Sequence, residues 1–133
     1  MLNAPYDVER EHDVLIATPH NFEVEALDML ELVAELCAGV RSDACRTVLF
    51  DLSQVAYLSS ACLGEMVSLA RDIEPMRSRI VLAGCVADVK QLLEVTRLCT
   101  LFESFDTMEE AREELGLAAQ APLSGGGGQL RAA

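Results

Sequence analysis

The sequence predicts a single α/β domain built on a mixed, mostly parallel β-sheet with about four helices. Two short apolar runs, TVLFDL at 47–52 and RIVLAG at 79–84, have the continuous hydrophobicity of strands that are covered on both faces. The segments that follow them space their apolar residues three and four positions apart, which indicates amphipathic helices. Alternation of strands and helices favours a parallel sheet with helices packed against it.

The first predicted elements are a hairpin and a long helix. The segment VEREHDVLIATP at 8–19 alternates and then becomes apolar, which predicts two antiparallel strands with a turn near His12 and Asp13. A helix is expected over 25–37, with Gly39 as its C-terminal cap. Its predicted inward residues are Leu27, Leu30, Ala34 and Cys37, and its predicted outward residues are Asp28, Glu31 and Glu35.

After Ser60 the sequence again predicts alternating helices and strands. The helix that follows Ser60 is expected to end before Pro75, and RIVLAG to form the next strand. Its predicted inward residues are Leu63, Met66, Val67 and Ala70, and its predicted outward residues are Glu65, Ser68 and Asp72. Val89, Leu92 and Leu93 mark a third helix, and LFESF at 101–105 a last short strand. Thr107 then begins a helix with Glu110 at capping-box spacing.

Length and composition predict where the domain ends. At 133 residues the chain fits one domain, which we expect to span 1–117. Hydrophobic residues make up 51% of the chain but aromatic residues only 5%, so the core should consist mainly of aliphatic side chains. The segment 118–133, AAQAPLSGGGGQLRAA, has no periodic pattern and is expected to be a flexible C-terminal tail.

Charge restricts the possible partners. The net charge is −12, and the ten basic residues are scattered along the sequence, which argues against nucleic-acid binding. No stretch of about 18 apolar residues is present, and the N-terminus has no basic region followed by an apolar run. We therefore expect a cytoplasmic protein without membrane insertion, whose partner is a basic or mixed-charge protein.

The five cysteines, at 37, 45, 62, 85 and 99, form no CxxC pair and have no histidine nearby. This spacing suits neither a zinc site nor a disulfide framework, so we expect reduced structural thiols and no metal. Cys37, Cys85 and Cys99 lie in apolar stretches, where free cysteine behaves as a small hydrophobic residue.

The pair Ser59 and Ser60 stands between a strand and an apolar-periodic helix. A serine in this place is usually an N-cap, whose oxygen accepts a backbone N–H bond. The free N–H groups and positive dipole end of the helix also tolerate a phosphate. The same position can therefore serve as a cap and as a phosphorylation site.

Cys62 lies where a helix dipole could lower a thiol pKa, but a catalytic cysteine also needs a base. The only histidines are His12 and His20, and no signature connects either of them to Cys62. No Gly-rich phosphate loop, HExxH or GxSxG is present. The sequence thus predicts no catalytic residue, and His20 is expected to be a loop residue.

The stretch VLFDLSQVAYLSSACLG at 48–64 resembles the signature of STAS-domain proteins, the anti-sigma factor antagonists. Asp51-Leu52 matches the strand end of that family, Tyr57-Leu58 its link, Ser60 its phosphorylated serine and Leu63-Gly64 its helix start. The segment RIVLAGCVADVKQLLEVTRLCTLFESFDTMEEA at 79–111 is similar to the usual ending of the family, so the resemblance covers about 6–116.

Three positions depart from the family pattern. Ser59 stands where the family often has Asp, and Cys62 where it usually has Gly. PHNF at 19–22 replaces a glycine-containing turn after the second strand. The last change affects the surface on which a partner would bind.

The resemblance implies a STAS-type fold and a non-enzymatic switch in a bacterial partner-switching pathway. Such a protein binds an anti-sigma factor that is a serine-protein kinase, is phosphorylated at Ser60, with Ser59 as the alternative position, and is reset by a serine phosphatase. ATP belongs to the kinase, so no cofactor is expected. The expected partner-binding residues are Tyr57, Ser59, Ser60, Ala61, Glu65 and Ser68.

A second interpretation is a STAS scaffold subunit of an ABC-type lipid-transport or sensory complex, without phosphorylation. An enzyme that uses Cys62 is the third. Phosphate on Ser60 separates the first two interpretations, and selective labelling of Cys62 by an electrophile tests the third.

Overall fold

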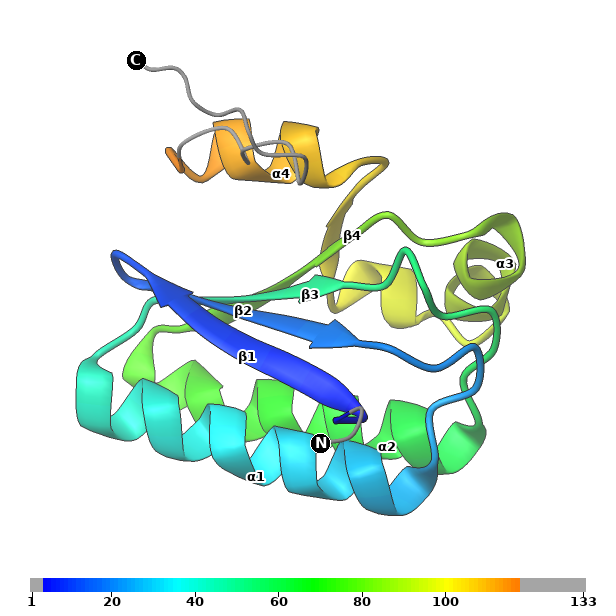
Figure 1. Cartoon of the computed structure of the whole chain (residues 1–133), viewed down its shortest axis with the longest axis horizontal. Coiled ribbons are helices and arrows are strands. Elements are labelled where there is room, and N and C mark those ends of the chain that lie inside the picture. The colour runs from blue at the N-terminus through cyan, green and yellow to red at the C-terminus, as the bar shows by residue number, and fades with distance from the viewer. Residues whose placement is uncertain (1–3, 118–133) are drawn as a thin grey trace.

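A five-stranded mixed sheet forms the centre of the protein in a computed structural model, which describes residues 4–117. The strands are β1 (Tyr6–Glu11), β2 (Val14–Pro19), β3 (Thr47–Asp51), β4 (Arg79–Ala83) and β5 (Glu103–Phe105), and they lie side by side in the order of the chain (Figure 1). β1 pairs with β2 in antiparallel fashion around a turn at His12 and Asp13, and the other pairings are parallel. The predicted hairpin and the mostly parallel sheet are confirmed.

Four α-helices pack on this sheet. They are α1 (Ala26–Asp43), α2 (Ser60–Ile73), α3 (Ala87–Val95) and α4 (Met108–Glu114), with single 3₁₀ turns η1 (Glu74–Met76) and η2 (Leu98–Thr100). Figure 1 shows α1 and α2 side by side on one face of the sheet and α4 on the other. The predicted fold class is therefore correct. β5 is shorter than the predicted strand at 101–105, because η2 and its C-terminal cap Leu101 come directly before it.

Alternation along the strands builds a core on each face of the sheet. Val48 and Phe50 of β3 belong to the larger core, which they form with α1, α2 and α3. Leu49, between them, belongs to the smaller core, in which Ala111 of α4 lies. Burial on both faces explains why the strand sequences are continuously apolar, as the sequence predicted.

The helix α1 differs from its prediction in both length and orientation. It continues six residues past the predicted end at Cys37, to Asp43. Its buried residues are Met29, Leu32, Val33, Leu36 and Val40. The predicted inward residues Leu27, Leu30 and Ala34 are exposed, and Cys37 is only half-buried. The helix carries two apolar stripes, and the predicted one is exposed.

Gly39 is not the cap of α1 but a contact point within it. A Cβ at this position would lie 2.8 Å from Leu15 Cδ1 of β2, so the missing side chain lets the helix approach the sheet closely. The C-terminal cap is Ala44, which has the left-handed backbone that glycine usually provides. The predicted cap was therefore wrong, because Gly39 lies inside the helix and Ala44 terminates it.

The predictions for α2 and α4 agree better with the structure. Leu63 and Met66 are buried with Cys62, Leu69 and Ile73, whereas Val67 and Ala70 are half-buried. α2 ends at Ile73, before Pro75 as expected, and Pro75 itself lies in the 3₁₀ turn η1. At α4, Thr107 Oγ1 accepts from Glu110 N at 3.1 Å, which confirms this cap, although the Glu110 carboxylate accepts from Asp106 N.

Candidate functional site

The start of α2 divides the two serines between two roles. Ser59 is the N-cap, and its Oγ accepts a hydrogen bond from Cys62 N at 3.1 Å. Ser60 is the first residue of the helix and is exposed. Within residues 4–117 its hydroxyl forms no hydrogen bond. The cap and the free hydroxyl therefore belong to two neighbouring serines. The sequence alone left open whether one serine is both the cap and the phosphorylation site.

Cys62 has a structural position. Its side chain is buried, and its thiol donates to Val24 O at 3.1 Å, so it fixes the start of α2 to the segment that precedes α1. No hydrogen bond between Cys62 and either histidine is found in the described part of the chain. The geometry gives no support to a nucleophilic cysteine.

Two loops meet beside the start of α2. One connects β2 to α1, and the other connects β3 to α2. The carbonyl oxygen of Phe22 in the first loop accepts from Ala56 N at 2.7 Å and from Tyr57 N at 3.0 Å in the second. Glu23 and Tyr57 also form an isolated parallel bridge. These backbone contacts hold the PHNF segment against the link that leads to Ser59.

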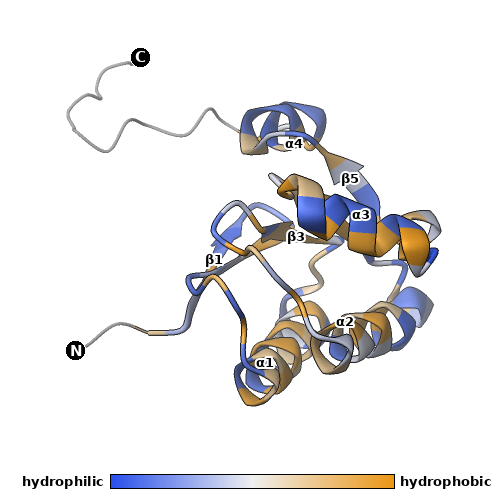
Figure 2. Ribbon diagram, turned by 90° about the vertical axis from the view of Figure 1, so that its right-hand side faces the viewer, coloured by the Kyte–Doolittle hydropathy of each residue, from blue (hydrophilic) through white to orange (hydrophobic). Residues whose placement is uncertain are grey.

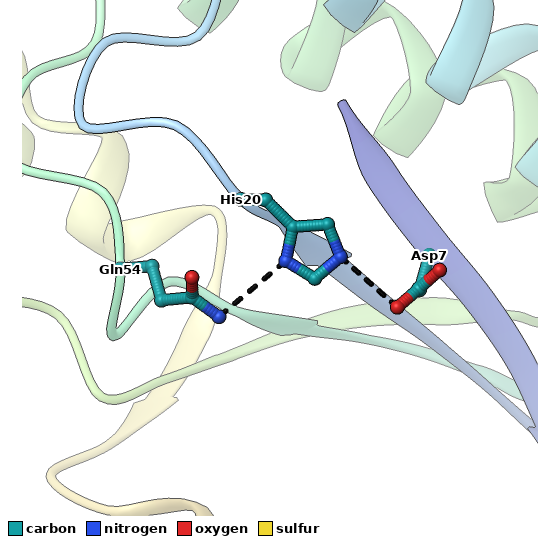
Figure 3. A network of polar contacts seen from close by, with 3 residues as sticks. All are labelled: Asp7, His20 and Gln54. Atoms are coloured by element: carbon teal, nitrogen blue, oxygen red, sulfur yellow. Dashed lines mark hydrogen bonds and ion pairs between the residues drawn. The ribbon is translucent and has the colours of Figure 1, made fainter. Parts of the chain in front are cut away.

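A polar network extends this contact to the edge of the sheet (Figure 3). His20 Nε2 lies 3.0 Å from Asp7 Oδ2 on β1, and His20 Nδ1 lies 3.5 Å from Gln54 Nε2 in the loop before α2. His20 is thus a loop residue, as predicted. It connects β1 with both loops at the carboxyl end of the sheet.

The residues predicted to bind a partner lie on the loop before α2 and along this helix. Tyr57 is 54% exposed, and Ser60, Ala61 and Ser68 are exposed as well. Ser59 and Glu65 are half-buried, so they offer less surface than expected. Gly64 is also exposed, and a Cβ there would have no atom of the described residues within 4 Å. The outward side of the first turns of α2 therefore consists largely of small residues.

Three further apolar side chains, which were not predicted to bind a partner, are exposed near this site. Phe22, in the loop that contacts Tyr57, is 79% exposed. Leu27 and Leu30, in the first turns of α1, are 65% and 46% exposed. α1 and α2 start at the same end of the sheet, which faces the viewer in Figure 2. The sequence offered one signal for Phe22 as a site residue, because it is an aromatic residue in the otherwise polar segment HNFE.

The thiols behave as the sequence predicted, with one exception. All five are free; burial raises the pKa of the Cys85 thiol to about 11 and also raises the pKa of Cys45. Both therefore stay protonated at neutral pH. Cys99, expected in an apolar environment, is exposed, because it lies on the 3₁₀ turn η2.

Neither a metal site nor a membrane span is found in residues 4–117. No group of three or more His, Cys, Asp or Glu side chains in this range is placed to hold a metal ion. Among the described helices, none is both long and apolar enough to cross a bilayer. The site is thus a surface of hydroxyls, small residues and exposed apolar side chains.

Solved structures with this fold include several anti-sigma factor antagonists. TM1081 of Thermotoga maritima superposes with a TM-score of 0.73 at 22% identity, over 87% of this chain and 92% of that one. An anti-sigma-factor antagonist (STAS) domain protein from Planctomyces limnophilus gives 0.73 at 20% identity, over 86% and 99%. The Bacillus protein SpoIIAA in its phosphorylated form gives 0.67 at 14% identity, over 83% and 98%.

At these identities the structural similarity establishes the fold. The sequence itself matches the STAS domain family over residues 8–111, which include both serines, the start of α2 and the two loops beside it. Within the described residues, the match leaves out only the start of β1 and the end of α4 among the helices and strands. The chain therefore belongs to the STAS domain family.

Proposed function

We propose that this protein is a cytoplasmic anti-sigma factor antagonist that binds an anti-sigma serine kinase through the start of α2. Phosphorylation of Ser60 by that kinase releases the partner, and a serine phosphatase restores binding. SpoIIAA, an anti-sigma factor antagonist with the same fold, has been solved in an unphosphorylated and a phosphorylated form, which supports the proposal.

The observation that carries the proposal is the difference between the two serine hydroxyls. Ser59 Oγ is occupied by the N–H of Cys62, whereas the Ser60 hydroxyl is exposed and, within the described residues, has no hydrogen-bond partner. A kinase can therefore reach Ser60 without breaking the cap of the helix. A phosphate at the first helical residue is also favoured by the helix dipole, so the fold should tolerate it.

The surroundings of Ser60 are suited to a protein partner. Exposed Phe22 and Tyr57 provide apolar contact area on one side. Gly64, one turn along the helix, would contact no atom of residues 4–117 if it had a Cβ. Glycine in a helix costs about 1 kcal/mol relative to alanine. A glycine that the fold does not require at this position is therefore consistent with close approach of a partner backbone.

The release step follows from charge. A phosphate adds about −1.5 to −2 charges at pH 7 to an interface formed around a hydroxyl. Glu65, near Ser60 on the same helix, adds to the repulsion of an acidic group on the partner. A loss of about 3 kcal/mol is modest for such a clash and weakens binding more than a hundredfold.

Incubation of the protein with its cognate kinase and ATP, followed by mass spectrometry, tests the site. We expect one phosphate on the wild type and on Ser59→Ala, and none on Ser60→Ala. Ser59→Ala serves as the matched control, since it removes the neighbouring hydroxyl and about 1 kcal/mol of cap energy. Phosphate on Ser59 would move the site by one residue, and no phosphate at all would favour the STAS scaffold interpretation.

Calorimetric titration with the kinase tests the switch. Ser60→Asp should fold normally and bind more than about a hundredfold more weakly, whereas Ser60→Ala should bind like the wild type. Ser42→Asp is the control: it places the same charge near the C-terminal end of α1, away from Ser60, and should leave the affinity unchanged. Equal loss in both Asp variants would mean that net charge, and not the modification site, governs binding.

A further inference from the structure

Basic residues that are scattered in the sequence come together at the end of the sheet opposite Ser60. Arg41 lies in the last turn of α1, Arg46 directly precedes β3, and Arg77 lies between η1 and β4. These positions are at the amino ends of the parallel strands, whereas Ser60 follows their carboxyl ends. The cluster is therefore separate from the proposed kinase-binding site.

The three arginines line one concavity of about 320 Å³. Its walls also include Val40, Ala44, Cys45, Met76 and Ser78, and no carboxylate from the described part of the chain lines it. Arg41, Arg46 and Arg77 are all exposed, and none of their guanidinium groups forms a hydrogen bond or ion pair within the described residues. In a chain with a net charge of −12, such a group of unpaired cations requires an explanation.

The backbone under the arginines is fixed before any ligand binds. Ser78 Oγ donates to Cys45 O at 2.6 Å, and Arg79 N donates to Arg46 O at 3.1 Å. These bonds connect the turn after α1 with the turn after η1. Arg46 and Arg77 therefore extend from two turns that are joined to each other, which lowers the entropic cost of bringing their side chains onto one ligand.

We propose that this concavity, called the arginine pocket below, binds a small anion that carries two linked phosphoryl groups. A guanidinium forms paired, charge-assisted hydrogen bonds to phosphoryl oxygens, and three of them match the charge of a diphosphate. The apolar walls formed by Val40 and Met76 can accept a small organic group attached to the phosphates.

The adjoining surface favours a compact anion over an acidic protein segment. A second concavity of about 410 Å³ shares Arg46 and Arg77 with the arginine pocket and also contains Arg79. Asp13 and Glu114 line this second concavity, and Arg79 is paired with Glu103. An acidic chain that continued from the arginine pocket would meet these carboxylates, whereas a diphosphate would stay within the first concavity.

Titration with sodium pyrophosphate at constant ionic strength, followed by amide chemical shifts in NMR spectra, tests the proposal. We expect saturable shifts at residues 44–46 and 76–78, and weaker binding of inorganic phosphate. Arg46→Gln and Arg77→Gln should each weaken pyrophosphate binding about tenfold, and the double variant should abolish it. Arg97→Gln, which removes an exposed arginine at the start of η2, is the control and should bind like the wild type.

Three results would overturn the proposal. Absence of saturable binding excludes the site. Equal weakening by Arg97→Gln would show diffuse attraction of anions by any exposed arginine. Tighter binding of a poly-glutamate peptide than of pyrophosphate at the same residues would show that the pocket accepts an acidic protein segment instead. Kinase binding through Ser60 is measured separately, so its failure does not affect this test.

Discussion

The helices α1 and α2 occupy equivalent places but present different surfaces. Both follow a parallel strand, start at the same end of the sheet and cover the same face (Figure 1). α2 starts with a hydroxyl cap at Ser59, whereas Glu25 at the start of α1 makes no side-chain cap. α1 exposes Leu27 and Leu30 in its first turns, whereas the first turns of α2 expose mainly small residues.

We infer from this difference that the two helices contribute differently to the proposed partner surface. The start of α2 is held by its cap and by the Cys62 thiol, so the position of Ser60 does not depend on a partner. Its small outward residues leave room for close approach. α1 and the loop before it expose the larger apolar side chains, which the proposal expects to contribute contact area. The three predictions that follow test whether stability and binding divide in this way.

The largest expected effect separates the two apolar stripes of α1. Met29→Ala should lower the free energy of unfolding by about 2–5 kcal/mol, because Met29 is fully buried. Leu30→Ala, one residue along, should change it by less than about 0.5 kcal/mol, since Leu30 is 46% exposed. Urea denaturation monitored by circular dichroism measures both. Similar losses in the two variants would mean that the Leu27–Leu30 stripe is covered within the domain.

The second prediction concerns the apolar side chain that the structure added to the site. Phe22→Ala should weaken kinase binding about tenfold while leaving the unfolding midpoint unchanged, because the Phe22 side chain is 79% exposed. Val95→Ala, which truncates a side chain 69% exposed at the end of α3, is the matched control and should not affect binding. Unchanged affinity in Phe22→Ala would restrict the interface to α2.

The smallest expected effect is also the most specific, because stability and binding should change in opposite directions. Gly64→Ala should raise the free energy of unfolding by up to about 1 kcal/mol, since the added methyl contacts nothing and alanine is the better helix former. The same methyl should weaken kinase binding measured by calorimetry. Ala38→Gly, at an exposed position of α1, should lower stability by a similar amount and leave binding unchanged. Tighter binding by Gly64→Ala would show that no partner approaches this turn closely.

The sequence predicted the sheet and the start of α2 because their signals are local. Continuous apolar runs such as TVLFDL arise when both faces of a strand are covered, and in a parallel sheet helices on the two faces provide that cover. The serine pair before a periodic apolar segment is likewise a local signal of a helix start. These features do not depend on distant parts of the chain.

The orientation of α1 could not be predicted, because its sequence has two stripes with helical spacing. Leu27, Leu30 and Ala34 repeat as regularly as Met29, Leu32 and Leu36. Which stripe packs on the sheet depends on complementary surfaces, such as the fit of Gly39 against Leu15. An exposed apolar stripe on a helix is typical of an interaction surface, and this pattern is already present in the sequence.

The candidate site was only partly predictable for a similar reason. Tyr57, Ser60, Ala61 and Ser68 follow from position along one loop and one helix. Phe22 joins them only because its carbonyl oxygen is bonded to the backbone of Ala56 and Tyr57, more than thirty residues later. The arginine pocket also combines segments that are separate in the sequence. Contacts between distant segments leave no periodic pattern that a single sequence can show.

The order of the strands has a consequence for biosynthesis. Since the sheet runs β1 to β5 in chain order, each new strand that leaves the ribosome finds its pairing neighbour already made. The contact of α4 with the first hairpin does not follow this order. The buried Arg112 of α4 donates to Glu11, 101 residues earlier, at 2.6 Å. This bond can form only when α4 has been synthesised. The growing sheet therefore leaves one face uncovered until the end, and a nascent chain that stalls before α4 exposes Leu49 and Val81 to chaperones.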